Sequence, residues 1–159
     1  MRLHFLHRVA VIDYVWAILW MGLIFFFSTD AGSFSNTIHY LDPILRFLFP
    51  HITSHALLLM HQLIRKLSHV TEYAILSYFW FRALSQGGKN WSLRSALWAL
   101  GLSISYALLD EYHQTFVSSR TASLIDVGID SLGALMTQVY LFITSQQPLP
   151  EPNRDKAAS

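Results

Sequence analysis

Ionisable side chains occur at three places where this sequence is otherwise strongly apolar. One group has the spacing K-x-x-H-x-x-E, a second begins with an Asp-Glu pair, and a third consists of two aspartates four residues apart. Because ionised groups inside membrane segments are costly, they are seldom present there without a function. The candidate site residues are Lys66, His69, Glu72, Asp110, Glu111, Gln114, Arg120, Asp126 and Asp130.

These residue types fit three kinds of chemistry. His69 and Glu72 form an acid–base pair that can move protons in a water-poor pocket. Lys66 and Arg120 are suited to hold a phosphate or carboxylate, the arginine in bidentate fashion. The four remaining acids offer the oxygen ligands that Mg²⁺ and Ca²⁺ prefer. Together the groups suit a phosphorylated, membrane-embedded substrate such as a lipid-linked cell-wall precursor, but they would equally make a purely structural ion network.

The composition is that of a membrane protein. Hydrophobic residues make up 53% of the 159 residues and charged residues only 13%, whereas soluble domains average about 25% charged residues. The net charge of +1 and the lack of a basic stripe argue against nucleic acid as a partner. The sequence contains no cysteine, which excludes disulfides, thiolate metal sites and a cysteine nucleophile.

Four apolar segments are long enough to place the candidate residues within a membrane. They cover residues 9–28, 64–84, 95–116 and 124–145. Each has about 20 residues, the length that spans a hydrocarbon core of about 30 Å. We therefore expect an all-α fold, an integral membrane four-helix bundle formed by residues 1–147. The proline-rich polar stretch 148–159 is expected to be a disordered cytoplasmic tail.

A shorter insertion separates the first two segments. Leu41-Asp42-Pro43 predicts a break in helical structure, because proline disfavours helix at the residue before it. The apolar pieces 44–49 and 56–63 are too short to span a bilayer. We expect short interfacial or re-entrant helices in this insertion.

The distribution of positive charge predicts the orientation of the segments. If the four segments alternate across the membrane, most lysines and arginines fall on the side of the two termini. The positive-inside rule then places both termini in the cytoplasm and all three groups of candidate residues near the extracytoplasmic interface. At about 100° per residue, Asp126, Asp130, Gly133 and Thr137 share an arc of about 60°, and a small residue such as Gly133 allows close helix packing.

The combined motifs identify a family resemblance. They are Arg65-Lys66-x-x-His69-x-x-Glu72-Tyr73, Asp110-Glu111-x-His113-Gln114-x-Phe116-Val117-x-x-Arg120 and Asp126-Val127-x-Ile129-Asp130-x-x-Gly133. In order and spacing they resemble the VanZ-like family of bacterial membrane proteins over nearly the whole chain, apart from residues 35–63 and the tail. One departure is Ser118-Ser119, which stands where the family usually has Pro-Gly before the loop arginine.

The resemblance implies a multi-pass protein of the bacterial cytoplasmic membrane with a function in the cell envelope. We expect it to bind or modify an envelope lipid or cell-wall precursor, with a link to glycopeptide (teicoplanin) resistance. The alternative is a non-enzymatic accessory membrane protein whose buried ions only assemble the helices. A divalent cation is a candidate cofactor and membrane lipid the expected partner. Whether the protein is an enzyme, and its oligomeric state, stay open at this point.

Overall fold

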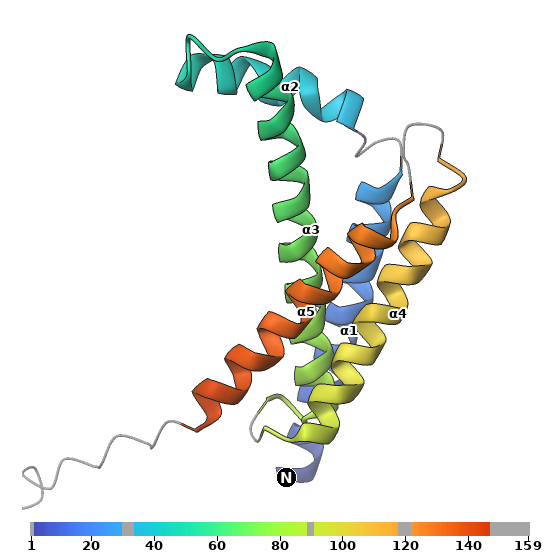
Figure 1. The fold of residues 1–159 in the computed structure, drawn as a ribbon. Coiled ribbons are helices and arrows are strands. Elements are labelled where there is room, and N and C mark those ends of the chain that lie inside the picture. The colour runs from blue at the N-terminus through green and yellow to red at the C-terminus, as the bar shows by residue number, and fades with distance from the viewer. Residues whose placement is uncertain (1, 30–33, 89–90, 118–121, 147–159) are drawn as a thin grey trace, which may run out of the picture.

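Within the residues that the computed structural model describes, which are 2–29, 34–88, 91–117 and 122–146, the protein consists of helices and contains no strand. The expected all-α fold is therefore confirmed. The helices are α1 (Arg2–Ser28), α2 (Phe34–Leu48), α3 (Ser54–Leu84), α4 (Leu93–Gln114) and α5 (Leu124–Ser145), as Figure 1 shows. The expected tail at 148–159 and the loop arginine Arg120 lie outside the described residues.

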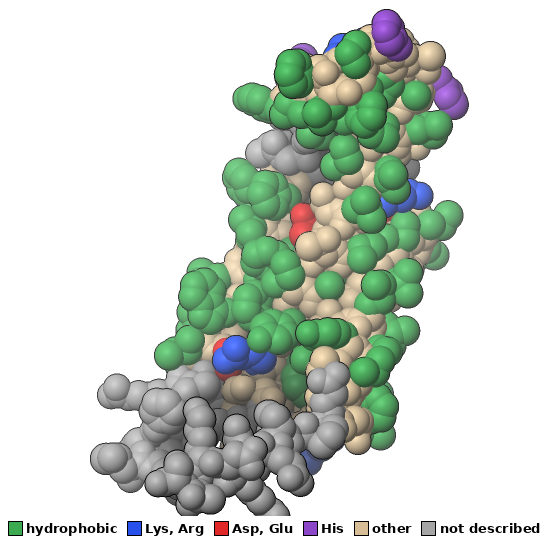
Figure 2. Space-filling view, turned by 90° about the vertical axis from the view of Figure 1, so that its left-hand side faces the viewer, with side chains coloured by type: hydrophobic (Ala, Val, Ile, Leu, Met, Phe, Trp, Pro, Cys, Tyr) green, Lys and Arg blue, Asp and Glu red, His purple; other side chains and the backbone are tan. Residues whose placement is uncertain are grey.

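Four helices, α1, α3, α4 and α5, pack alongside one another, whereas α2 lies across one end of α3 (Figure 1). Two of them are long and apolar enough to cross a membrane, α1 through Val11–Ser28 and α5 through Leu124–Ser145. Large hydrophobic side chains are exposed over most of the length of the molecule (Figure 2). An exposed apolar surface of this extent is typical of contact with lipid or with another protein.

The predicted start of the second apolar segment at residue 64 is wrong, because α3 begins at Ser54 and has 31 residues. Thr53 caps this helix, and its side-chain oxygen accepts a hydrogen bond from the backbone N–H of Ala56 at 3.2 Å. Such a cap satisfies one of the N–H groups that have no partner within the helix. Residues 56–63 are therefore the first turns of α3 rather than a separate interfacial piece.

The break predicted at Leu41-Asp42-Pro43 is also wrong, because Pro43 lies inside α2. Proline cannot donate to the carbonyl four residues earlier, so the helix loses one hydrogen bond there. Asp42, the residue before Pro43, makes two side-chain contacts here. Its Oδ1 lies 2.6 Å from Nε2 of His61 on α3, and its Oδ2 lies 3.9 Å from Nε of Arg46, one turn further along α2.

The ends of the other predicted segments agree to different degrees with the structure. The segment predicted at 124–145 coincides with α5, and that predicted at 95–116 is α4, which begins and ends two residues earlier. The first segment, predicted at 9–28, ends correctly, but α1 already begins at Arg2. The apolar runs in the sequence thus predicted the central part of these helices better than their polar ends.

The close packing predicted at Gly133 is confirmed. A methyl group added at Gly133 would overlap the backbone carbonyl of Val70 on α3. One turn further along α5, the Thr137 hydroxyl donates to the carbonyl of Ala74 at 2.9 Å. The residues on the same face of α5 just before Gly133 are therefore held directly against α3.

Candidate functional site

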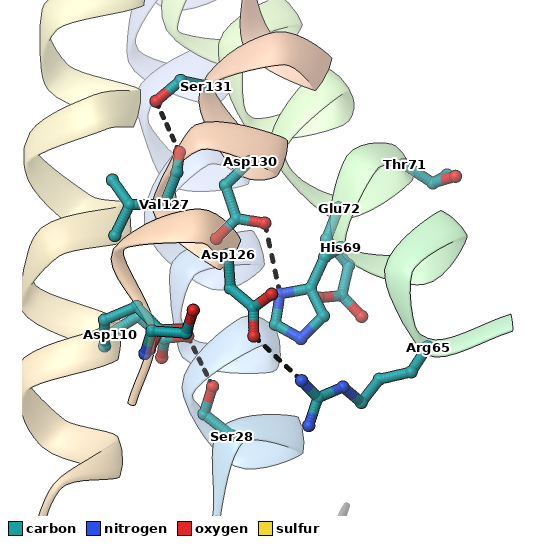
Figure 3. Close-up of polar contacts among 12 residues, drawn as sticks. Ser28, Arg65, His69, Thr71, Glu72, Asp110, Asp126, Val127, Asp130 and Ser131 are labelled. Carbon is teal, nitrogen blue, oxygen red and sulfur yellow. Dashed lines mark hydrogen bonds and ion pairs between the residues drawn. The ribbon is translucent and has the colours of Figure 1, made fainter. Parts of the chain in front are cut away.

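An ion pair and a histidine–carboxylate contact join α3 and α5, one helical turn apart (Figure 3). Arg65 Nη2 lies 2.9 Å from Asp126 Oδ2, and His69 Nδ1 lies 3.2 Å from Asp130 Oδ1. The partners on each helix are four residues apart, so both pairs lie where the two helices face each other. Asp130 is fully buried, whereas the Arg65 side chain is 34% exposed. The first of these contacts therefore includes an accessible cation, and the second includes a fully enclosed carboxylate.

A group of hydrogen bonds joins the end of α1 to the end of α4. The Ser28 hydroxyl donates to Asp110 Oδ2 at 2.6 Å. The side-chain amide of Gln114 donates to the same oxygen at 3.0 Å and to the Ser28 oxygen at 3.2 Å. All three side chains are buried. These bonds fix the orientation of the Asp110 carboxylate and attach α1 to α4.

Glu111 connects α4 with the start of α5. Its Oε2 accepts the backbone N–H of Ser123 at 2.7 Å, at the N-terminus of α5. A carboxylate in this position pairs an N–H that has no partner within the helix and interacts favourably with the helix dipole. Glu111 also interacts electrostatically with His69, Asp126 and Asp130. The polar residues of α3, α4 and α5 therefore belong to one site.

We refer to this site as the polar cluster. Tyr73 belongs to it, because it is fully buried and interacts electrostatically with Asp110 and Asp130. Glu72 borders it on α3 and interacts with His69. The polar cluster consists of Ser28, Arg65, His69, Glu72, Tyr73, Asp110, Glu111, Gln114, Asp126 and Asp130.

Several buried polar atoms of the cluster have no hydrogen-bond partner among the described residues. They are His69 Nδ1, Tyr73 OH, Asp110 Oδ1, Glu111 Oε1 and both carboxylate oxygens of Asp130. The contact between Asp130 and His69 is close enough for an ion pair but lacks the geometry of a hydrogen bond. Buried polar groups in native proteins are nearly always paired. Their clustering here therefore indicates hydrogen-bonding capacity directed at something other than the helices.

The structure brings most of the predicted site residues together. Those that are buried within the polar cluster are His69, Asp110, Glu111, Gln114, Asp126 and Asp130. Glu72 is half-buried and lies beside His69 on α3 (Figure 3). Lys66 is exposed and lies outside the cluster, and Arg120 lies outside the described residues. Within the described parts of the chain, no group of three or more His, Asp or Glu side chains is placed to hold a metal ion.

Arg65, Ser28 and Tyr73 belong to the cluster but are not among the predicted site residues, and in the case of Arg65 the neighbouring Lys66 was predicted in its place. The helical period contains the signal that would have found Arg65. At about 100° per residue, Arg65, His69 and Glu72 fall within an arc of about 60°, whereas Lys66 widens the arc to about 120°. Ser28 was missed as well, and it had no comparable signal, because its partner Asp110 is 82 residues away in the sequence.

A further ion pair lies near the other end of α3. Arg82 Nε lies 3.2 Å from Oδ1 of Asp13 on α1, and Asp13 is only 4% exposed. The Arg82 guanidinium also donates to the Tyr78 hydroxyl at 3.3 Å. This pair was not among the predicted site residues. It joins α1 to α3 and is a natural comparison for the ion pairs of the polar cluster.

The fold and the polar cluster define a class, that of all-helical proteins with membrane-length apolar helices and ionisable groups buried between them. A family model described as VanZ/LLP1 matches residues 14–144, and the chain belongs to this family. The resemblance drawn from the motifs is thereby confirmed. The comparison with curated proteins and the comparison with solved structures each found no match.

Proposed function

We propose that this protein is embedded in the bacterial cytoplasmic membrane and binds the headgroup of an envelope lipid or lipid-linked cell-wall precursor in its polar cluster. In this proposal α3 and α4 cross the bilayer together with α1 and α5. Exposed apolar residues on α4, such as Leu97, Trp98 and Leu109, support this, since side chains of this kind are suited to face lipid. Membership of the VanZ/LLP1 family agrees with a membrane location.

The observation that carries the proposal is the set of buried carboxylate oxygens without a partner among the described residues. Asp130 Oδ2, Asp110 Oδ1 and Glu111 Oε1 have no hydrogen-bond partner in the described part of the chain, and Asp130 Oδ1 has only the 3.2 Å contact with His69 Nδ1. Each unpaired buried polar group costs roughly 1–3 kcal/mol. A network that served only to assemble the helices would gain stability by pairing them. A ligand whose hydroxyl or amine groups donate hydrogen bonds would pair them instead, which is why we favour binding over a purely structural role.

Cationic side chains border the polar cluster on its accessible side. Arg65 is partly exposed, and Lys66, one residue further along α3, is exposed. A guanidinium binds phosphate oxygens in a bidentate manner, and an ammonium group adds a point charge. A headgroup that carries both a phosphate and hydroxyl groups therefore matches the cluster. Its phosphate would meet Arg65 and Lys66, and its hydroxyls would reach the buried acids.

The imidazole of His69, oriented by Asp130, is the group that would accept a proton from such a ligand. Asp130 contacts Nδ1 of the imidazole, so Nε2 is the ring nitrogen that faces away from this carboxylate. An imidazole that is oriented by a carboxylate is a common form of general base. Any modification of the bound headgroup would use this pair as its proton acceptor. Altered susceptibility to the glycopeptide teicoplanin is the cellular effect that we expect.

A binding measurement tests this proposal. We would purify the protein in detergent and measure binding of a polyprenyl phosphate by native mass spectrometry, with phosphatidylcholine as the reference lipid. Asp130→Asn keeps the shape of the side chain and removes its charge, and Asp13→Asn makes the same change at the ion pair outside the cluster. Losing one charge-assisted hydrogen bond costs about 1.5–3 kcal/mol, so we expect Asp130→Asn to weaken binding roughly tenfold or more.

The control variant decides how this result is interpreted. Asp13→Asn should bind the polyprenyl phosphate as the unaltered protein does. If Asp130→Asn folds normally, elutes as the unaltered protein does and binds equally well, the cluster is structural and the proposal is wrong. Glu72→Gln, on the rim of the cluster, provides a second variant in case Asp130→Asn does not fold.

The proposed orientation has its own test, since the chain contains no cysteine. Single cysteines at Gly88, Ser119 and Ser159 can be labelled in intact cells with a membrane-impermeant maleimide. Labelling at Ser119 alone would agree with cytoplasmic termini and a polar cluster at the extracytoplasmic face. Labelling at Gly88 and Ser159 but not at Ser119 would place the cluster on the cytoplasmic side and exclude a ligand on the outer leaflet.

A further inference from the structure

α2 presents an exposed apolar stripe along one side. Tyr40, Ile44, Phe47 and Leu48 recur at spacings of three and four residues and share an arc of about 100°. Phe47 is 83% exposed and Tyr40 is 77% exposed. Side chains of this size are seldom left in water on a helix that also has a polar side. The stripe therefore needs an apolar environment that α3 does not supply.

The other sides of α2 are occupied in different ways. Leu45 is buried against the rest of the molecule, and Asp42 contacts His61 of α3 at 2.6 Å. Arg46 and His39 are exposed and lie on the side of the helix opposite the apolar stripe. α2 therefore has three sectors, one on α3, one polar and exposed, and one apolar and exposed. This division is typical of a helix at the boundary between water and lipid.

The direction of α2 agrees with such a position. It lies across the end of α3, at a steep angle to the helices that run side by side (Figure 1). Because α1 and α5 are the helices suited to cross the membrane, α2 runs roughly along the membrane plane. Leu59, Leu63 and Leu67 are exposed at intervals of four residues and lie on the side of α3 away from His61, the residue that contacts α2. This apolar face of α3 is suited to contact lipid at the level where α3 meets α2.

We propose that α2 is an interfacial helix that inserts its apolar stripe at the boundary between headgroups and acyl chains of the same bilayer that α1 and α5 cross, and thereby sets the depth of the polar cluster. The contact between Asp42 and His61 fixes α2 to α3 at this level. From His61 to Arg65 is four residues, or about 6 Å along the helix, and to His69 about 12 Å. The cluster then lies just below the headgroups, where the long side chain of Arg65 extends back to the phosphates.

This placement specifies the route of the ligand. A headgroup at this depth approaches from within the bilayer, whereas a soluble molecule would have to enter the apolar region beside α2. The ligand is therefore a membrane-resident amphiphile that meets Arg65 from the side. This statement about the ligand depends on the proposed function, but the position of α2 does not.

Nitroxide labels measure the position of α2 directly. Single cysteines at Ile44 and Phe47 report on the apolar stripe, and those at His39 and Arg46 report on the polar side. The labelled protein is placed in vesicles of phosphatidylethanolamine and phosphatidylglycerol. Collision rates with oxygen, which concentrates in lipid, and with a water-soluble nickel chelate are then measured by electron paramagnetic resonance. We expect oxygen to dominate at the stripe and nickel to dominate at the polar side.

Two reference positions separate the outcomes. Leu135 is exposed in the middle of α5, and Gly88 lies in the loop after α3. Labels at Ile44 and Phe47 should give depths between these two. Nickel collisions at the stripe as frequent as at Gly88 would overturn the inference, as would depths equal to that of Leu135 on both sides of α2. A stripe inaccessible to both reagents would show that protein, such as a second copy of the chain, covers it.

The same measurements distinguish a failure of this inference from a failure of the proposed function. If Leu135 itself is accessible to the nickel chelate, α5 does not cross the bilayer and the membrane proposal as a whole fails. If Leu135 is deep and the stripe is in water, only the position assigned to α2 is wrong. A label at Tyr40 repeats the measurement on the stripe in case a cysteine at Phe47 disturbs the helix.

Discussion

Neutralising Arg65 should destabilise the protein more than neutralising Lys66, the residue beside it. Arg65 pairs with Asp126 at 2.9 Å across α3 and α5, and the Asp126 side chain is only 11% exposed. Lys66 lies on the surface of α3. The two residues have the same charge and adjacent positions, so the comparison isolates the effect of the ion pair.

The expected magnitude follows from the burial of the two partners. Exposed ion pairs contribute about 0–1 kcal/mol, whereas removing one partner of a fully buried pair costs about 3–5 kcal/mol. With Asp126 nearly buried and Arg65 about one-third exposed, we expect Arg65→Gln to lower the free energy of unfolding by roughly 1–3 kcal/mol. Lys66→Gln should change it by no more than about 0.5 kcal/mol.

The assay is reversible unfolding in mixed micelles by increasing fractions of SDS, followed by tryptophan fluorescence. A double-mutant cycle with Asp126→Asn isolates the interaction between the two side chains, and we expect a coupling energy of roughly 1–2 kcal/mol. Equal destabilisation by Arg65→Gln and Lys66→Gln, or a coupling energy near zero, would refute the assignment of Arg65 to the polar cluster.

Three further substitutions test how the cluster is held in place. Ser28→Ala should cost about 1.5–3 kcal/mol of unfolding free energy in the same assay, because it removes a hydrogen bond to the Asp110 carboxylate; an unchanged value would contradict the link between α1 and α4. Gly133→Ala should cost about 1–3 kcal/mol, because its methyl group would overlap the backbone of α3, whereas Gly128→Ala, with open space around it, should be neutral or stabilising. Thr53→Ala should cost about 1 kcal/mol through loss of the helix cap, with faster amide hydrogen exchange in the first turn of α3; exchange at the unaltered rate would argue against this start of the helix.

The core helices could be predicted from the sequence where a long uncharged run coincides with clear boundaries. α5 is the best example, because Ser123 caps it and apolar residues fill most of its length. The start of α3 could not be found in the same way. A membrane span of about 20 residues accounts for the apolar run 64–84 but gives no reason to extend the helix further towards the N-terminus. The helix begins at Ser54, and the local signal for this start is the capping residue Thr53.

Most of the candidate site could be predicted because ionisable residues in apolar segments are conspicuous. His69, Asp110 and Asp130 were found for this reason, and the structure buries all three. The sequence could not show which residues pair, since pairing depends on how the helices rotate about their axes. Ser28 illustrates the limit, because a serine at the end of an apolar segment has many ordinary roles.

Site-specific photo-crosslinking is the measurement that tests the central claim most directly. A benzophenone amino acid replaces Lys66, which lies beside the polar cluster, or Arg94, which is exposed at the start of α4. After irradiation of intact cells, the protein is purified and the attached lipid is identified by mass spectrometry. We predict a phosphorylated lipid attached at position 66, absent at position 94 and reduced when Asp130→Asn is added. The same lipids in the same proportions at both positions, unaffected by Asp130→Asn, would contradict a headgroup-binding site in the polar cluster.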